Sequence, residues 1–180
     1  GYNLALTGSN VASGLYAVDP LAANGQGTQI VLNQVGNVIT GSANGVSYFT
    51  LTIDPATGAV TLNLLDNVWH GNTGSHDDSV SLTLNSGVLT LVQTVTDADG
   101  DNAKASIDLG TGGVFRFEDD GPTAGLADEA PSLGSVKVDE SLPALGGVGG
   151  DGIVSATLAA ATVQAQFSHA FGADGAGNIG

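Results

Sequence analysis

The chain has 180 residues, a length that allows one large or two small domains, and 42% of its residues are hydrophobic, which is enough for a packed core. Eighteen acidic residues against three basic ones give a formal net charge of −15, so a nucleic-acid or anionic-lipid partner would be repelled, whereas cations would be attracted. The absence of cysteine excludes disulfides and thiolate metal sites. No apolar run reaches the roughly 18 residues of a membrane span, so we expect no membrane insertion.

Apolar and polar side chains alternate with a period of two along most of the chain before Pro122, which is typical of half-buried strands. Turn sequences such as Asp54-Pro55-Ala56-Thr57-Gly58 and Asn85-Ser86-Gly87 predict antiparallel hairpins, because no connection is long enough for a crossover helix. We therefore predict an all-β fold, an antiparallel β-sandwich of Ig-like or Greek-key type. The alternating segments are residues 2–6, 48–53, 60–64, 80–84, 89–95, 103–109 and 114–117.

The composition changes after Pro122, where further prolines and a glycine cluster over residues 146–152 follow. We place a domain boundary there. It separates a main sandwich body, residues 1–122, from a Gly/Pro-rich linker with strands, residues 123–180. The alanine-rich stretch 157–165 has helix propensity, but its Thr and Val content favours a strand. The strands predicted in this second part are residues 136–138, 153–158 and 163–167.

Three aspartates crowd into the turn Asp97-Ala98-Asp99-Gly100-Asp101. Their spacing resembles the opening of an EF-hand loop, with Asp108 at position twelve, but the glycine is fourth instead of sixth. The segment from Asp101 to Asp108 alternates like a strand and would span on the order of 23 Å, so we reject the EF-hand and expect Asp108 to face solvent. A hairpin turn with three carboxylates is a partial shell for an oxygen-loving cation such as Ca²⁺. An Asp-Gly turn selected only for its backbone geometry is the alternative.

A second acidic cluster, Glu118-Asp119-Asp120, ends a strand just before Gly121-Pro122. Such a cluster at a domain exit can share a cation with the next domain, and the acidic pair that follows residues 136–138 would be the receiving side. A solvated linker kept polar for solubility is the alternative. The complete set of predicted Ca²⁺ ligands is Asp97, Asp99, Asp101, Glu118, Asp119, Asp120, Asp139 and Glu140.

Other candidate sites are weaker. His70, His76 and His169 could be imagined as a zinc set, but their separation in the sequence favours ordinary turn or surface histidines. Trp69 is expected to close one end of the core instead of stacking on a sugar. The stretch 146–154 fits one copy of a nine-residue calcium repeat, which needs several consecutive copies, so we interpret it as a loop. No activated serine or cysteine nucleophile is recognisable, and we expect no enzyme.

The combined order of these motifs resembles the long acidic tandem repeat of giant RTX adhesins secreted by the type I pathway. The resemblance rests on residues 91–101, Ile107-Asp108-Leu109 and residues 115–122, with shorter pieces at residues 12–15, 77–80, 138–141 and 171–177. In such repeats a glycine-rich element like residues 172–177 precedes a strand like Tyr2–Leu6. We therefore expect that residues 123–180 are the head of one repeat and residues 1–122 the tail, completing one sandwich within a molecule or between neighbours.

The resemblance implies a secreted protein of the bacterial cell surface, built of β-sandwich modules with calcium as the structural ion. Its function would be that of a scaffold or spacer that positions ligand-binding domains for adhesion or biofilm formation. The expected partners are neighbouring adhesin domains of the same chain and, through them, host or microbial surface ligands, with no nucleic acid. A calcium-dependent, lectin-like module that itself binds a glycan or surface ligand is the alternative.

Overall fold

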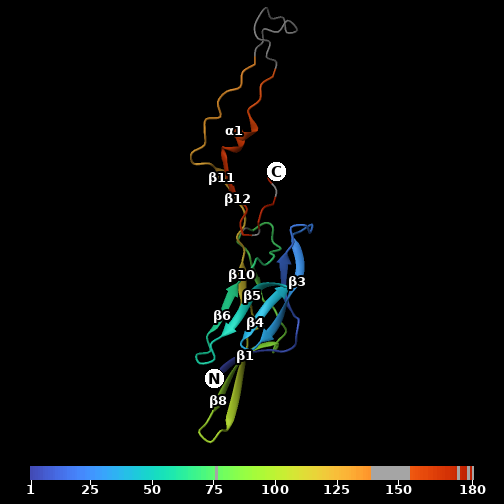
Figure 1. Cartoon of the computed structure of the whole chain (residues 1–180), viewed down its shortest axis with the longest axis vertical. Helices are drawn as coiled ribbons and strands as arrows, with labels where there is room; N and C mark the ends of the chain where they lie inside the picture. The colour runs from blue at the N-terminus through green and yellow to red at the C-terminus, as the bar shows by residue number, and fades with distance from the viewer. Residues whose placement is uncertain (76, 139–154, 174, 178, 180) are drawn as a thin grey trace, which may run out of the picture. The chain divides into compact units, whose positions relative to one another are not determined.

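The structure is a computed structural model that describes residues 1–75, 77–138, 155–173, 175–177 and 179. The chain divides into two compact units: unit 1 comprises Gly1–Gly121 with Ala173–Gly180, and unit 2 comprises Pro122–Gly172. The described residues of unit 1 form ten strands (Figure 1): β1 Tyr2–Leu6, β2 Val11–Val18, β3 Gln26–Val35, β4 Val38–Ala43, β5 Val46–Ile53, β6 Val60–Leu64, β7 Ser79–Ser81, β8 Leu89–Thr96, β9 Asn102–Asp108 and β10 Arg116–Glu118.

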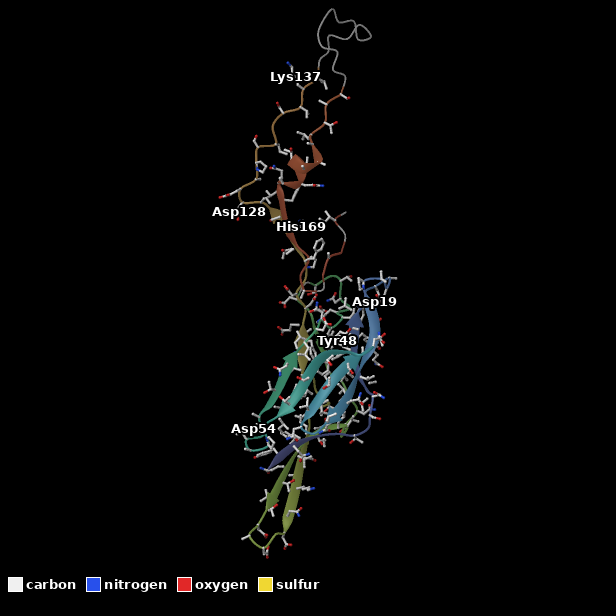
Figure 2. All side chains as sticks on the ribbon, viewed as in Figure 1. Asp19, Tyr48, Asp54, Asp128, Lys137 and His169 are labelled. Atoms are coloured by element: carbon white, nitrogen blue, oxygen red, sulfur yellow. The ribbon has the colours of Figure 1, made fainter. Side chains whose placement is uncertain are left out.

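Unit 1 is an antiparallel β-sandwich, as the alternation predicts. Its larger sheet is a five-stranded meander in the order β2-β3-β4-β5-β6, whose neighbouring arrows are visible in Figure 1. The other strands form a three-stranded sheet in the order β1-β8-β9 and a two-stranded sheet of β10 and β7. The turn that begins at Asp54, labelled in Figure 2, joins β5 to β6 as a hairpin and confirms the first predicted hairpin.

One apolar core joins all three sheets of unit 1. The alternating side chains of Leu4 on β1, Leu51 on β5 and Leu89 on β8 are at most 1% exposed. The rings of Phe49 and Phe117 pack together with their centroids 4.9 Å apart. Burying each such side chain contributes roughly 1.5–3 kcal/mol, so this common core holds the sheets together.

The predicted hairpin at Asn85–Gly87 is wrong. β7 pairs with β10, whereas β8, the strand after the turn, pairs with β1 and β9. The residues just before the turn also bond to the distant segment 110–115, because the amide of Leu82 donates to the carbonyl of Phe115 (3.0 Å) and that of Leu84 to Gly110 (2.8 Å). Both leucines are buried, and their backbones pair with residues 110–115 instead of with β8. The turn at Asn85–Gly87 therefore connects two different sheets, that of β7 and that of β8.

Unit 2 contains strand β11 (Thr123–Leu126), helix α1 (Ala160–Gln164) and strand β12 (Phe167–Ala170). β11 and β12 form an antiparallel ladder. The strands predicted over 136–138 and 163–167 are wrong, and so is the described part, 155–158, of the strand predicted over 153–158. The amide of Ala165 donates to the carbonyl of Ala161, so the alanine-rich stretch satisfies its backbone locally, as its helix propensity favours.

None of the described residues of unit 2 is buried. No helix in the described part of the chain has the length and the apolar character that crossing a bilayer demands.

Candidate metal centre

The hairpin of β8 and β9 positions the Asp97–Asp101 turn. The two strands pair in continuous register down to Thr96 opposite Asn102. Gly100 has a φ of +102°, a left-handed conformation that glycine adopts without a steric penalty. The turn closes because the amide of Asp97 donates to the carbonyl of Asp101 at 2.9 Å. The predicted tight hairpin turn is therefore present.

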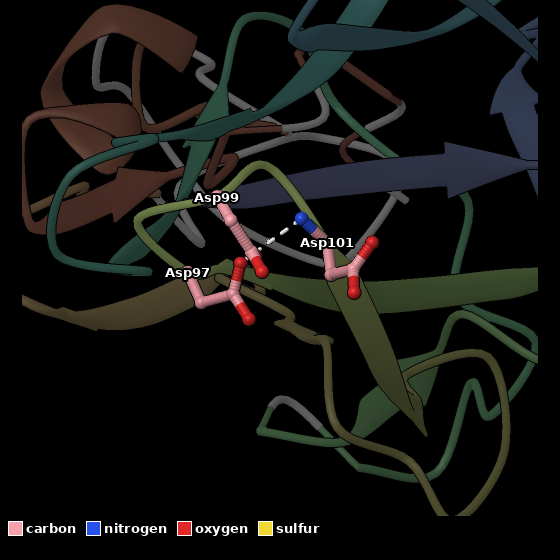
Figure 3. Close-up of side chains that lie close together, drawn as sticks. All are labelled: Asp97, Asp99 and Asp101. Carbon is pink, nitrogen blue, oxygen red and sulfur yellow. Dashed lines mark hydrogen bonds between the residues drawn. The ribbon is translucent and has the colours of Figure 1, made fainter.

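The Asp97 carboxylate organises this turn. Its Oδ1 accepts hydrogen bonds from the backbone amides of Asp101 (2.9 Å) and Gly100 (3.2 Å), and Figure 3 shows the first of them as a dashed line. A hydrogen bond with the Asp99 side chain, followed by these backbone amides, lowers the pKa of the Asp97 carboxyl. These hydrogen bonds from Asp97 to the backbone are also expected if the turn was selected only for its backbone geometry, which is the alternative interpretation.

The same turn gathers three possible ligand groups. One carboxylate oxygen from each of Asp97, Asp99 and Asp101 lies within 4.8 Å of the others, and all three residues are exposed. Figure 3 shows the three carboxylates around one side of the turn. Oxygen ligands at this spacing suit Ca²⁺, which takes six to eight oxygens at about 2.3–2.6 Å and tolerates irregular geometry. The turn could supply three protein ligands and leave the other positions to water or to another molecule.

The sequence predicts that Asp108 faces solvent, but its carboxylate is held by hydrogen bonds from two loops. Its Oδ2 accepts hydrogen bonds from the amide of Gly87 (2.6 Å) and the hydroxyl of Ser86 (2.9 Å). Its Oδ1 accepts from the amides of Gly110 (2.8 Å) and Thr111 (3.2 Å). These bonds, with that of Gly87 the largest contribution, lower the pKa of the carboxyl. Asp108 therefore ties the turn before β8 to the loop after β9.

The second acidic cluster lies at the end of β10. Glu118 and Asp120 are exposed and Asp119 is half-buried. The amide of Asp119 donates to the carbonyl of Asp78 (2.9 Å), and the amide of Asp120 donates to Asp119 Oδ1 (2.9 Å). Among the described residues, the structure gathers only the Asp97–Asp101 aspartates into a group of three at ligand spacing.

Glu118, Asp119 and Asp120 line a pocket of about 150 Å³ in unit 1. Asn67 on its wall donates a side-chain hydrogen bond to the carbonyl of Ala173, and the amide of Ala173 donates to the carbonyl of Asp120 at 3.2 Å. These bonds attach the start of the C-terminal segment to the pocket wall. The two remaining predicted ligands, Asp139 and Glu140, lie outside the described residues.

His70 is not the turn or surface residue that the sequence favoured. Its side chain is only 6% exposed, and its Nδ1 lies 3.4 Å from Asp78 Oδ1. Val68, two residues earlier, is buried and bridges to Ala17. Extension of the two-residue alternation from Val68 to His70 was the sequence signal that could have identified this buried histidine.

Trp69, which lies between Val68 and His70 in the sequence, packs against the loop before β3. Its Nε1 donates to the carbonyl of Asn24 (2.9 Å), and its ring meets that of Tyr16 edge-on. Trp69 is half-buried but is not among the residues that pack against the hydrophobic core, so its contacts with Asn24 and Tyr16 do not bear out the prediction that it closes one end of the core.

Comparison with known proteins adds one family. Residues 1–110 match a family described as a domain of unknown function, DUF5801. No curated protein and no solved structure matches the chain. The matched region runs from β1 through β9 and contains the Asp97–Asp101 turn, but ends before the acidic cluster of β10. Because this match extends over more than half of the residues, the chain belongs to the DUF5801 domain family.

Proposed function

We propose that this domain is a structural spacer of a secreted bacterial surface adhesin, made rigid by Ca²⁺. The observation that carries the proposal is the group of three exposed carboxylates at the tip of the β8–β9 hairpin of an all-β body. The resemblance of the motif order to RTX adhesin repeats supports the cell-surface setting and the scaffold role, with neighbouring adhesin domains as the partners. The proposed role is not enzymatic.

Ca²⁺ would act on the part of the hairpin that has least packing. Val95 near the tip is 59% exposed and Ala103, its partner across the hairpin, is also exposed, whereas Leu89 at the other end of β8 is fully buried. The outer turn therefore depends on backbone hydrogen bonds and on its aspartates. An ion that bridges three like charges replaces their repulsion with shared coordination and restricts the turn, which is the property a spacer requires.

The exposure of the triad also favours the lectin-like alternative. An ion held by Asp97, Asp99 and Asp101 alone keeps open coordination positions, because it needs six to eight ligands. Oxygens of a neighbouring domain or of a glycan could fill these positions. The turn residues Ala98 and Gly100 and the flanking Thr96 and Asn102 offer no aromatic ring on which a sugar could stack, so we place the spacer first.

The experiment is thermal unfolding of the whole chain after chelation and again after Ca²⁺ is added. An ion that binds only the folded form raises the unfolding midpoint. When the free ion concentration is a hundred times its dissociation constant, the free energy of unfolding increases by about 2.7 kcal/mol. The triple variant D97N/D99N/D101N should lose this response, whereas the matched control D128N, which removes one exposed acid of unit 2, should keep it. An unchanged midpoint in the parent chain would reject the calcium site. Retention on a glycan array with Ca²⁺ alone would favour the lectin-like alternative.

A further inference from the structure

Strand β6 is an edge of the larger sheet and is unpaired on one side. Among the described residues it pairs only with β5 (Figure 1). Both ends of this ladder are hydrogen-bonded, because the amide of Asp54 donates to the carbonyl of Ala59 (2.9 Å) and that of Leu65 to Tyr48 (2.7 Å). Hydrogen-bonded and non-hydrogen-bonded pairs alternate along an antiparallel ladder. Every second residue of β6, starting with Val60, therefore points its amide and carbonyl away from β5.

The side chains of β6 also alternate. Val60, Leu62 and Leu64 lie on the core face of the sheet, since their partners on β5 are buried. Val60 and Leu62 pack against the core but are only half-buried, and Leu64 is 58% exposed. Thr61 and Asn63 are exposed on the other face. This edge therefore has apolar side chains on one face, polar ones on the other, and no charged residue.

The outer edges of the other long strands of unit 1 are covered or charged. Carbonyls of β2, whose register is irregular, accept hydrogen bonds from the amides of Thr83 and Trp69. On β1, the amide of Leu6 donates to the side-chain oxygen of Gln34 (2.7 Å). β9 has Lys104 at its centre, and a charged side chain on an edge opposes pairing with another chain. In the part of the chain that the structure describes, β6 has none of these features.

The residue pattern of β6 is complementary to itself. When two copies of the strand run antiparallel with Leu62 facing Leu62, Val60 of each lies opposite Leu64 of the other. Thr61 then lies opposite Asn63 on the outer face. Apolar side chains meet apolar ones, polar meet polar, and the facing backbone groups exchange hydrogen bonds. No like charges oppose each other in this arrangement, although each copy has a formal net charge of −15.

We propose that β6 is a dimer interface, through which a second copy of this chain extends the five-stranded sheet across a two-fold axis at Leu62. The same strand of both copies forms the contact, as an isologous interface requires. A strand of five residues is smaller than the roughly 20–30 residues a side of a stable interface, so the dimer is weak and forms where copies are concentrated. It does not depend on the proposed calcium function, because the Asp97–Asp101 turn is not part of β6.

The test is sedimentation equilibrium of the whole chain from micromolar to millimolar concentration. The average mass should rise from that of one chain toward that of two, and added salt should strengthen the association because it screens the net charges. The variant T61K/N63K places lysines opposite lysines across the axis and should weaken self-association by at least about tenfold. T61D/N63D should have the same effect with carboxylates. Both positions are exposed, so the fold is kept, and circular dichroism checks this.

Mixing the two variants tests the register. Lysine then lies opposite aspartate, so the mixture should associate, whereas each variant alone stays monomeric. The control N102K/S106K adds the same charge at exposed positions of β9 and should associate like the parent chain. A parent chain that is monomeric at millimolar concentration, a T61K/N63K variant that associates like the parent, a mixture that stays monomeric, or loss of association in the control would each overturn the proposal.

Discussion

Substitution of Gly41 by alanine tests the packing of the sandwich core. Gly41 lies on β4, and its backbone is not in the left-handed region, so alanine can adopt its conformation. A Cβ there would lie 2.4 Å from Cε1 and 2.5 Å from Cζ of Phe49. Carbon atoms in contact normally stay about 3.5–4.0 Å apart, so the ring would have to retreat by roughly 1 Å.

The ring of Phe49 has no free space for such a movement, because it is fully buried and packs against Phe117. Overpacking of this kind costs about 1–3 kcal/mol. The loss of glycine's freedom in the unfolded chain returns about 0.4–1 kcal/mol. Taking the middle of each range, we expect the free energy of unfolding of G41A to fall by about 1.3 kcal/mol. Urea denaturation followed by the fluorescence of Trp69, the single tryptophan and a residue of unit 1, measures it.

Two further variants make the experiment decisive. G74A in a loop of unit 1 is a matched control, because its Cβ would meet only Asn72 Oδ1, at 3.5 Å. It should change stability by less than about 0.5 kcal/mol. In the background of F49L the cost of G41A should shrink by at least about 0.5 kcal/mol, since the colliding ring is gone. A stability of G41A equal to that of the parent chain, or additivity of G41A and F49L, would refute the packing argument.

Two other predictions concern buried or tethering polar groups. Hydrogen bonds to the Asp108 carboxylate, led by that from Gly87, hold its pKa in the folded chain below the unfolded value of about 3.9. The ionised Asp108 therefore stabilises the fold fully above the unfolded pKa, and this stabilisation is lost as the pH falls through the folded pKa. The difference in the free energy of unfolding between the parent chain and D108N, measured by urea denaturation, should therefore become smaller between about pH 7 and about pH 3. A difference that does not change with pH would contradict this prediction. The hydroxyl of Ser13 is fully buried, donates to the carbonyl of Ile30 (2.6 Å) and accepts from the amide of Leu15 (3.1 Å), at an irregularity in the β2–β3 register. S13A should lower the unfolding free energy by about 1–3 kcal/mol in the same assay, and a change under about 0.5 kcal/mol would show that the backbone finds other partners.

The candidate calcium site was accessible to sequence reasoning because it is local. Asp97, Asp99 and Asp101 occupy alternate positions in one five-residue turn, so any tight hairpin brings their carboxylates together. The cluster at Glu118–Asp120 depends on other parts of the chain, and its position in the sequence could not show that it lines a pocket with His70.

The sequence by itself determined part of the strands of unit 1: alternation predicted β1, β5, β6, β8 and β9, whereas β2, β3 and β4 of the larger sheet were not predicted. Alternation reports which face of a strand is buried, and this information lies within each segment. In unit 2 the same criterion failed at residues 163–167, because the alanine-rich backbone satisfies its hydrogen bonds within a short helix. The helix propensity of alanine was the better guide there.

Only the tertiary structure decided which segments pair and which polar groups are enclosed. Leu82 pairs with the distant Phe115 instead of with the strand that follows it, and His70 is buried against Asp78 across the loop between β6 and β7. Asp108 shows the same limit, because four donors from two loops converge on a carboxylate that looks exposed in isolation. Periodicity depends on one segment at a time, whereas pairing and burial depend on which distant segments compete for the same core.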